Sequence, residues 1–144
     1  MRRYVIAFIA GFLATLIFHQ GLLALMSLAS LTVHKAYSMT ATSPLGVPQV
    51  ISLAFWGGLW GIVLSLVLPK RGGSARYYGF ALAFGAIVPS LVAWFVVMPL
   101  KGMPVAGGWD PAVIVGSLIL NGAWGVGTAL LIALTDRHRG LGAG

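Results

Sequence analysis

The segment Ala7–Gly21 reads AFIAGFLATLIFHQG, and it decides the class of fold. It lies inside an apolar run that continues from Tyr4 to about Val33. A helix needs only about 20 residues to cross a bilayer, so the run predicts a membrane-spanning helix that tilts, bends near Gly21 or projects outward. A signal peptide has an apolar core of only about 7–15 residues, so we interpret the run as a retained first span.

The composition extends this interpretation to the whole chain. Only 8% of the 144 residues are charged, and the mean hydropathy is +0.97. Soluble domains carry about 25% charged residues, so the excess apolar surface must face lipid. The net charge of +7 lies between and outside the apolar runs, which indicates membrane topology and not nucleic-acid binding. The absence of cysteine excludes disulfides and thiolate sites.

Four apolar runs predict four spans, at about residues 4–33, 48–68, 77–98 and 111–135. Helices are expected because lipid offers no partners to unpaired backbone groups. The predicted fold is therefore all-α, an integral membrane four-helix bundle forming one transmembrane domain.

Prolines and one aspartate predict where these helices begin, bend and end. Pro48 and Pro111 are expected at first helical positions, with Asp110 as an N-cap. Pro99 is expected just after the third helix, and Pro89 is expected to kink it.

The basic residues predict the orientation. One side of the membrane receives Arg2, Arg3, Lys70, Arg71, Arg76, Arg137 and Arg139, and the other receives Lys35 and Lys101. Basic residues concentrate on the cytoplasmic side, so both termini are expected there. The compact chain and the lack of targeting signals favour a bacterial inner (plasma) membrane.

The chain also resembles itself. A shift of 74 residues places Ala7, Gly11 and Thr15 on Ala81, Gly85 and Pro89, and a shift of 64 places the Gly58–Gly61 segment GLWG on the Gly122–Gly125 segment GAWG. We interpret the halves, about residues 1–70 and 75–138, as two parallel-repeat transmembrane hairpins related by a pseudo-two-fold axis along the membrane normal. Chance similarity between apolar helices is the alternative.

Small residues recur every four positions in each span, and they predict the faces on which the helices pack. Close backbone approach holds helices together in lipid. The residues expected at these contacts are Gly11, Thr15, Gly57, Gly61, Gly85 and Gly125.

Few residues could carry chemistry. Asp110 and Asp136, the two acidic residues, fall at the edges of spans, and no phosphate-binding or metal-ligand motif occurs. We therefore expect no catalytic residue, no metal site and no enzyme activity.

His19 is the strongest single candidate, because ionisable side chains within a membrane usually face the bundle interior or a cavity. It could bind haem or a quinone, or handle protons; alternatively, it is a neutral imidazole bonded to a neighbouring helix. His34 is expected beyond the membrane edge, so a bis-histidine haem would require a dimer or another ligand.

Other polar and aromatic residues inside the spans could join His19 in a pocket in the outer half of the membrane. Alternatively, the indoles simply fill space beside glycines. The candidate ligand-binding residues are His19, Gln20, Asn121, Trp56, Trp60 and Trp94. The outer loops at residues 34–43 and 106–109 are the expected external contact points.

Three functions fit these features. The first is a non-catalytic accessory subunit, whose partners are the lipid bilayer and other membrane protein subunits or a second copy of itself. The second is a small dimeric transporter or channel with a site near His19 and Asn121. The third is a haem- or quinone-binding membrane protein; the sequence identifies no particular cofactor.

Overall fold

The computed structural model describes the backbone of residues 1–69 and 72–141, with side chains up to Asp136. The side chains of Lys70, Arg71, Arg137 and Arg139, assigned above to the inner side, lie outside the described residues. Within this part of the chain, four helices are long and apolar enough to cross a membrane: Arg2–Leu28, Gln49–Val67, Ala75–Leu100 and Pro111–Asp136. The predicted all-α, four-span bundle is confirmed.

The first span is a single helix in three parts, α1 (Arg2–Ala14), the π-helical turn η1 (Thr15–His19) and α2 (Gln20–Leu28). It ends at Leu28 and not near Val33, although the intervening residues remain apolar. Ser30 adopts a φ of +57°, and the amides of Ser30 and Leu31 bond back to carbonyls of the last turn. This left-handed cap stops the helix where hydropathy alone would extend it.

The remaining spans are α3 (Gln49–Val67), the third helix made of α4 (Ala75–Val92), the π-helical turn η2 (Ala93–Val97) and α5 (Met98–Leu100), and α7 (Pro111–Leu141). Asp110 caps α7 as predicted, because its carboxylate accepts from the amide of Ala112 at 2.9 Å. Pro48 is the N-cap of α3 and not its first residue. Pro99 lies inside α5, and the third helix ends only where Gly102 adopts a φ of +72°.

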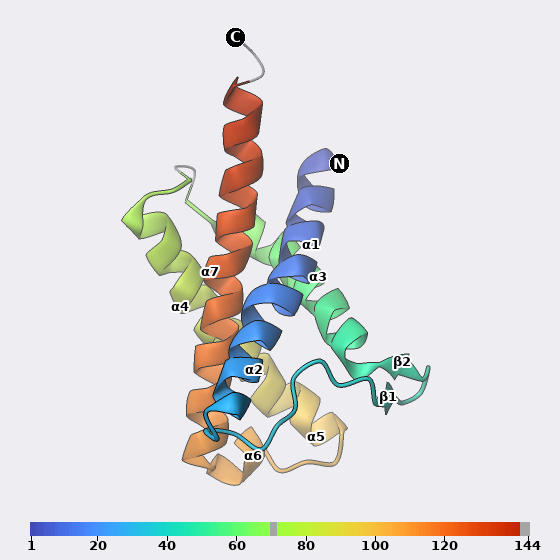
Figure 1. The fold of residues 1–144 in the computed structure, drawn as a ribbon. Coiled ribbons are helices and arrows are strands. Elements are labelled where there is room, and N and C mark those ends of the chain that lie inside the picture. Colours follow the sequence, from blue (N-terminus) through green and yellow to red (C-terminus); the bar gives the residue numbers. More distant parts are fainter. Residues whose placement is uncertain (70–71, 142–144) are drawn as a thin grey trace.

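Two connections lie at the far end of the bundle from the start of α1 and the end of α7 (Figure 1). The first contains β1 (Ala41–Thr42) and β2 (Val47–Pro48), which pair antiparallel. The second contains the single turn α6 (Ala106–Trp109). The strands are a local addition to an otherwise helical chain.

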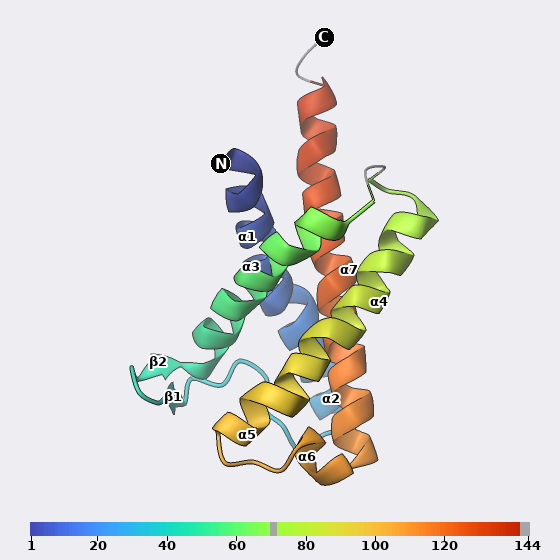
Figure 2. The ribbon, with the colours of Figure 1, turned by 180° about the vertical axis from the view of Figure 1, so that it is seen from behind.

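The helices pack as two antiparallel pairs. We call α1, η1, α2 and α3 the first hairpin, and the helices from α4 to α7 the second hairpin. Helix α1 packs along α3, and α4 packs along α7. The hairpins meet mainly through α1 and α7, while α3 and α4 flank them and make few contacts with each other (Figures 1 and 2).

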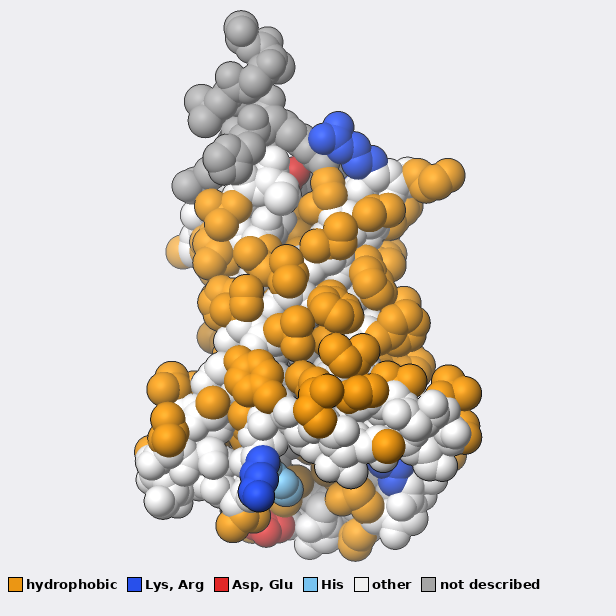
Figure 3. Space-filling model, turned by 45° about the vertical axis from the view of Figure 1, so that its right-hand side comes forward, with side chains coloured by type: hydrophobic (Ala, Val, Ile, Leu, Met, Phe, Trp, Pro, Cys, Tyr) orange, Lys and Arg blue, Asp and Glu red, His pale blue; other side chains and the backbone are white. Residues whose placement is uncertain are grey.

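Apolar and charged side chains are distributed over the surface as expected for a protein that spans a membrane. Figure 3 shows a broad apolar belt across the middle of the face in view, with charged side chains only near the two ends. Apolar side chains on every span are exposed, including Ile17, Trp56, Leu82 and Ile119. This exposure is expected if these side chains face lipid in a membrane.

Glycines bring the two helices of the first hairpin to backbone contact. A Cβ atom at Gly61 would lie 2.5 Å from the carbonyl oxygen of Ala7 and 3.0 Å from Cα of Gly11. One at Gly57 would collide with the hydroxyl of Thr15. Because any side chain would separate α1 from α3, these small residues set the distance between the helices.

The second hairpin repeats these contacts at the shifted positions. A Cβ atom at Gly125 would meet the carbonyl oxygen of Ala81 and lie 3.0 Å from Cα of Gly85. One at Gly85 would lie 2.6 Å from the carbonyl oxygen of Asn121. A further pair also matches: Phe8 fills the space beside Gly58, and Leu82 fills the space beside Gly122.

Candidate functional site

Most polar side chains within the spans bond to a neighbouring helix or to their own backbone. Trp124 donates its indole N–H to the carbonyl of Gly11 at 3.0 Å, which links α7 to α1. Asn121 donates to the hydroxyl of Ser90 at 2.9 Å, which links α7 to α4. Across the side chains described, no buried nitrogen or oxygen lacks a hydrogen-bond partner.

The predicted tryptophans are dispersed and do not gather around His19. Trp94 donates to the hydroxyl of Ser117 at 3.1 Å on α7. Trp60 packs edge-on against Phe84 of α4, with ring centroids 6.4 Å apart. Trp56 is 57% exposed on the outer face of α3.

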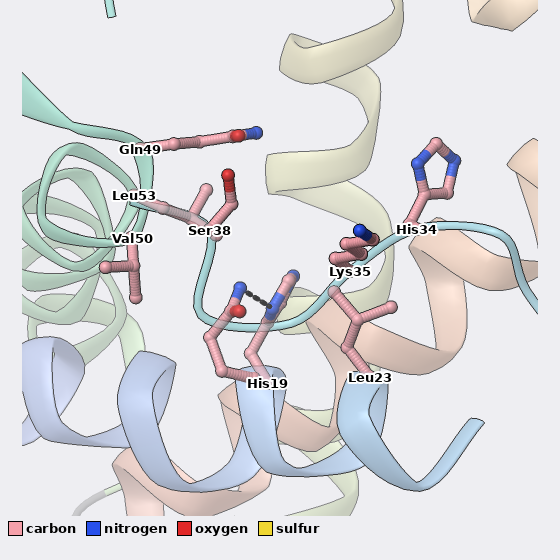
Figure 4. A pocket seen from close by; sticks show the side chains of 9 residues that line it. His19, Leu23, His34, Lys35, Ser38, Gln49, Val50 and Leu53 are labelled. Carbon is pink, nitrogen blue, oxygen red and sulfur yellow. Dashed lines mark hydrogen bonds between the residues drawn. The ribbon is translucent and has the colours of Figure 1, made fainter. Parts of the chain in front are cut away.

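His19 and Gln20 do line a cavity, which we call the outer cavity. Its volume is about 260 Å³, and it lies between η1, α2, the first connecting loop and the start of α3 (Figure 4). The lining residues are His19, Gln20, Leu23, His34, Lys35, Ser38, Gln49, Val50 and Leu53. Asn121 and the three candidate tryptophans are not among them.

The outer cavity exists because the loop after α2 folds back along the first span. The hydroxyl of Tyr37 donates to the carbonyl of Leu16 at 2.8 Å, and the amide of Tyr37 donates to the side chain of Gln20 at 2.7 Å. In an α-helix the amide of Gln20 would bond to Leu16, but in η1 it bonds to Thr15. The π-helical turn therefore presents a carbonyl on which the loop is anchored.

The same fold-back changes the surroundings of both histidines. His34, expected beyond the membrane edge, lines the same cavity as His19. Its ring is nevertheless turned away from His19 in Figure 4. Nδ1 of the His19 ring lies 3.4 Å from Nε2 of the Gln20 side chain, so these neighbouring side chains contact each other at the cavity wall.

Lys35, Ser38 and Gln49 surround the space next to His19 (Figure 4). The sequence did not identify these three as site residues, although Lys35 and Ser38 lie in a loop predicted to make external contacts. No local pattern predicts that this loop returns to His19, because the return depends on the two hydrogen bonds of Tyr37.

A second cavity, of about 330 Å³, lies at the opposite end, near the start of α1 and the end of α7. The guanidinium of Arg3 closes one side by donating to the carbonyl of Ser65. Tyr77 lines another side and donates its hydroxyl to the carbonyl of Ala129 at 3.1 Å. Between these two cavities the helices of each hairpin are in backbone contact.

No protein-family model, curated protein or solved structure matches this chain.

Proposed function

We propose that this small integral membrane protein is a non-catalytic subunit that packs within the bilayer against another membrane protein. The observation that carries the proposal is the use of its polar side chains inside the spans. Trp94, Asn121 and Trp124 each bond to a neighbouring helix. Such bonds stabilise a bundle in lipid, and they leave these groups committed to structure and not to a substrate.

The surface is compatible with this role. Helix α3 and the third span carry exposed aromatic side chains, and α3 and α4 make few contacts with each other. These side chains are Phe55 and Trp56 on α3, Phe80 on α4 and Phe95 on η2. Aromatic rings offer a large contact area, so these side chains suit a neighbouring membrane helix as well as lipid.

The proposal is tested by purification from the native membrane. A tagged full chain, extracted in mild detergent, should bring down the same few membrane proteins in repeated preparations, identified by mass spectrometry. Deletion of the gene should lower the abundance of those proteins. A chain that purifies alone, with its neighbours unchanged on deletion, would contradict the proposal.

We also propose that the two hairpins arose as copies of one unit. The support is that the contacts of Gly11 with Gly61 and of Gly85 with Gly125 fall at positions related by the same shifts as the sequence similarity. The similarity does not extend to the contact between the hairpins, because α1 packs on α7 much more closely than α4 packs on α3.

For location we propose the bacterial inner membrane, with both termini in the cytoplasm. The support is the charge pattern: Arg2, Arg3 and Arg76 lie at the starts of α1 and α4, whereas Lys35 and Lys101 lie in the connections at the opposite end of the bundle (Figure 1). The chain has no cysteine, so single cysteines can be placed at Ser43 and near the N-terminus. A membrane-impermeant maleimide should label only the first in spheroplasts; labelling of the second would reverse the orientation.

Ligand binding at His19 is the second candidate function, and the outer cavity favours it. Haem or quinone binding is tested by the visible spectrum and by organic extraction of purified protein. Transport receives less support, because backbone contact within each hairpin separates the two cavities and Asn121 bonds to Ser90 instead of lining the outer one. Liposome flux that disappears in His19→Ala would reverse that assessment.

A further inference from the structure

The outer cavity is lined by polar and basic side chains and by no acidic one. Its polar lining comes from three separate segments: the first span, the fold-back loop and the start of α3. Lys35 supplies a positive charge, and no aspartate or glutamate lines the cavity. Among the described residues, no ion pair of Lys35 is found. Such a lining is complementary to a negatively charged oxygen group.

The positive end of a helix adds to this charge. Helix α3 begins at Gln49, one of the lining residues, and its dipole places partial positive charge at that end. Its first two amides already donate to the carbonyls of Thr40 and Ser38. The helix therefore contributes to the electrostatic potential, while the side chains of Lys35 and Gln49 supply the donors, because the hydroxyl of Ser38 already donates to that of Thr40.

The depth of the cavity fits the headgroup region of a bilayer. Helix α3 has 19 residues, which at about 1.5 Å per residue spans roughly the 30 Å of a hydrocarbon core. Its first residue, Gln49, is the end of this span next to the polar connecting loop, which is the end that adjoins the headgroup region. The first span is longer by 8 residues, 27 against 19, and its η1 and α2 segments form the wall of the cavity facing α3.

One wall of the cavity is apolar. Leu23 and Val50 are buried, whereas Leu53 is 38% exposed one turn along α3. A ligand with a polar head between Lys35 and Gln49 could continue as a hydrocarbon chain over Leu53. The volume of about 260 Å³ suits a headgroup and not a whole lipid.

From these observations we infer that the outer cavity binds the anionic headgroup of a membrane lipid. The Lys35 ammonium pairs with the phosphate oxygens, the side-chain amide of Gln49 donates a hydrogen bond, and an acyl chain lies along Leu53. His19 and Gln20 close the inner wall. This inference does not depend on the subunit role, because the cavity belongs to the chain alone.

The experiment uses the full chain, purified in detergent and stripped of lipid. Binding is measured by native mass spectrometry and by the thermal unfolding midpoint after addition of phosphatidylglycerol, phosphatidylcholine or inorganic phosphate. Phosphatidylglycerol should bind and raise the midpoint, with phosphatidylcholine and inorganic phosphate at least tenfold weaker. Equal binding of the two lipids, or inorganic phosphate binding as tightly as phosphatidylglycerol, would overturn the lipid assignment.

Two variants localise the site. Lys35→Gln should weaken phosphatidylglycerol binding by about tenfold, the loss expected for one charge-assisted contact. Lys101→Gln removes the same charge at the same end of the molecule but outside the cavity, and it should leave binding unchanged. Equal losses in both variants would indicate general surface attraction and contradict a site. Gln49→Ala should produce a smaller loss, and no change in both Lys35→Gln and Gln49→Ala would also overturn the inference.

Discussion

The two hairpins close with the same contacts but differ in what they add to them. In the first, Gly11 and Gly61 bring α1 against α3; in the second, Gly85 and Gly125 bring α4 against α7. In the first hairpin, however, the loop folds back to form a cavity, and in the second the connection is the short turn α6. Close packing is therefore common to both hairpins, whereas the candidate ligand-binding residues that line the outer cavity belong to the first hairpin alone.

The two tryptophans related by the shift of 64 residues, Trp60 and Trp124, have different partners. Trp124 of the second hairpin reaches the backbone of Gly11, whose preceding residue is the small Ala10. Trp60 of the first hairpin extends toward α4 but meets the ring of Phe84, the residue that precedes Gly85. Under the shift of 74 residues Phe84 corresponds to the small Ala10, and α3 and α4 make fewer contacts with each other than α1 and α7 do.

The largest predicted effect on the free energy of unfolding comes from filling the glycine contacts, and it should be equal in the two hairpins. Gly61→Ala and Gly125→Ala each place a methyl group against backbone atoms of the opposing helix, so each should lower the free energy of unfolding by about 2–3 kcal/mol. Unfolding by SDS titration in mixed micelles measures this. Gly79→Ala and Gly116→Ala are matched controls, since a Cβ atom there meets nothing within 4 Å. Controls as damaging as the test variants would refute the contact argument.

The next effect should separate the two tryptophans. Trp124→Phe removes the N–H that donates to Gly11 and should cost about 1 kcal/mol, within the range measured for hydrogen bonds between membrane helices. Trp60→Phe keeps an aromatic ring beside Phe84 and should cost clearly less. Equal losses in the same unfolding assay would show that the hairpins are not distinguished in this way.

A smaller effect is expected from the polar contact found in the second hairpin. A double-mutant cycle with Asn121→Ala and Ser90→Ala should give a coupling of about 0.6 kcal/mol, the average for such bonds in lipid. The equivalent of Asn121 in the first hairpin is Gly57, where a side chain would collide with Thr15. A coupling indistinguishable from zero would mean that Asn121 has no structural link to Ser90.

The smallest effect on stability is expected in the loop of the first hairpin. Tyr37→Phe removes the bond to Leu16, so the loop should open while the global unfolding energy changes by less than about 1 kcal/mol. Trypsin should then cut after Lys35 several-fold faster, with cleavage after Lys101 in the other loop as the internal control. Unchanged cleavage after Lys35 would show that Tyr37 does not anchor the loop.

The spans and their packing faces were predictable because two simple features of the sequence encode them. Apolar length gives the spans, and small residues every four positions give the contacts at Gly11, Gly61, Gly85 and Gly125. The end of the first helix was not predictable from hydropathy, because Ser30 stops it through a backbone conformation.

The candidate site was only partly predictable. His19 and Gln20 were identified by their polarity within an apolar run, and they do line the outer cavity. Lys35 and Gln49 join them because of a loop path that no repeating pattern encodes. The tryptophans were expected to form a pocket, but they are spread over the bundle. Trp94 and Trp124 bond to neighbouring helices, and Trp56 is exposed on the surface.

Cysteine cross-linking in native membranes tests the matched construction of the two hairpins most directly, since the chain has no cysteine of its own. The pairs Phe8→Cys with Gly58→Cys and Leu82→Cys with Gly122→Cys sit at equivalent contacts in the first and second hairpins. With a short bifunctional thiosulfonate and detection by mass spectrometry, both pairs should cross-link to a similar extent, and the mixed pairs Phe8→Cys with Gly122→Cys and Leu82→Cys with Gly58→Cys should not. Cross-linking of a mixed pair as efficient as that of the native pairs, or the failure of one native pair in a folded protein, would contradict the account.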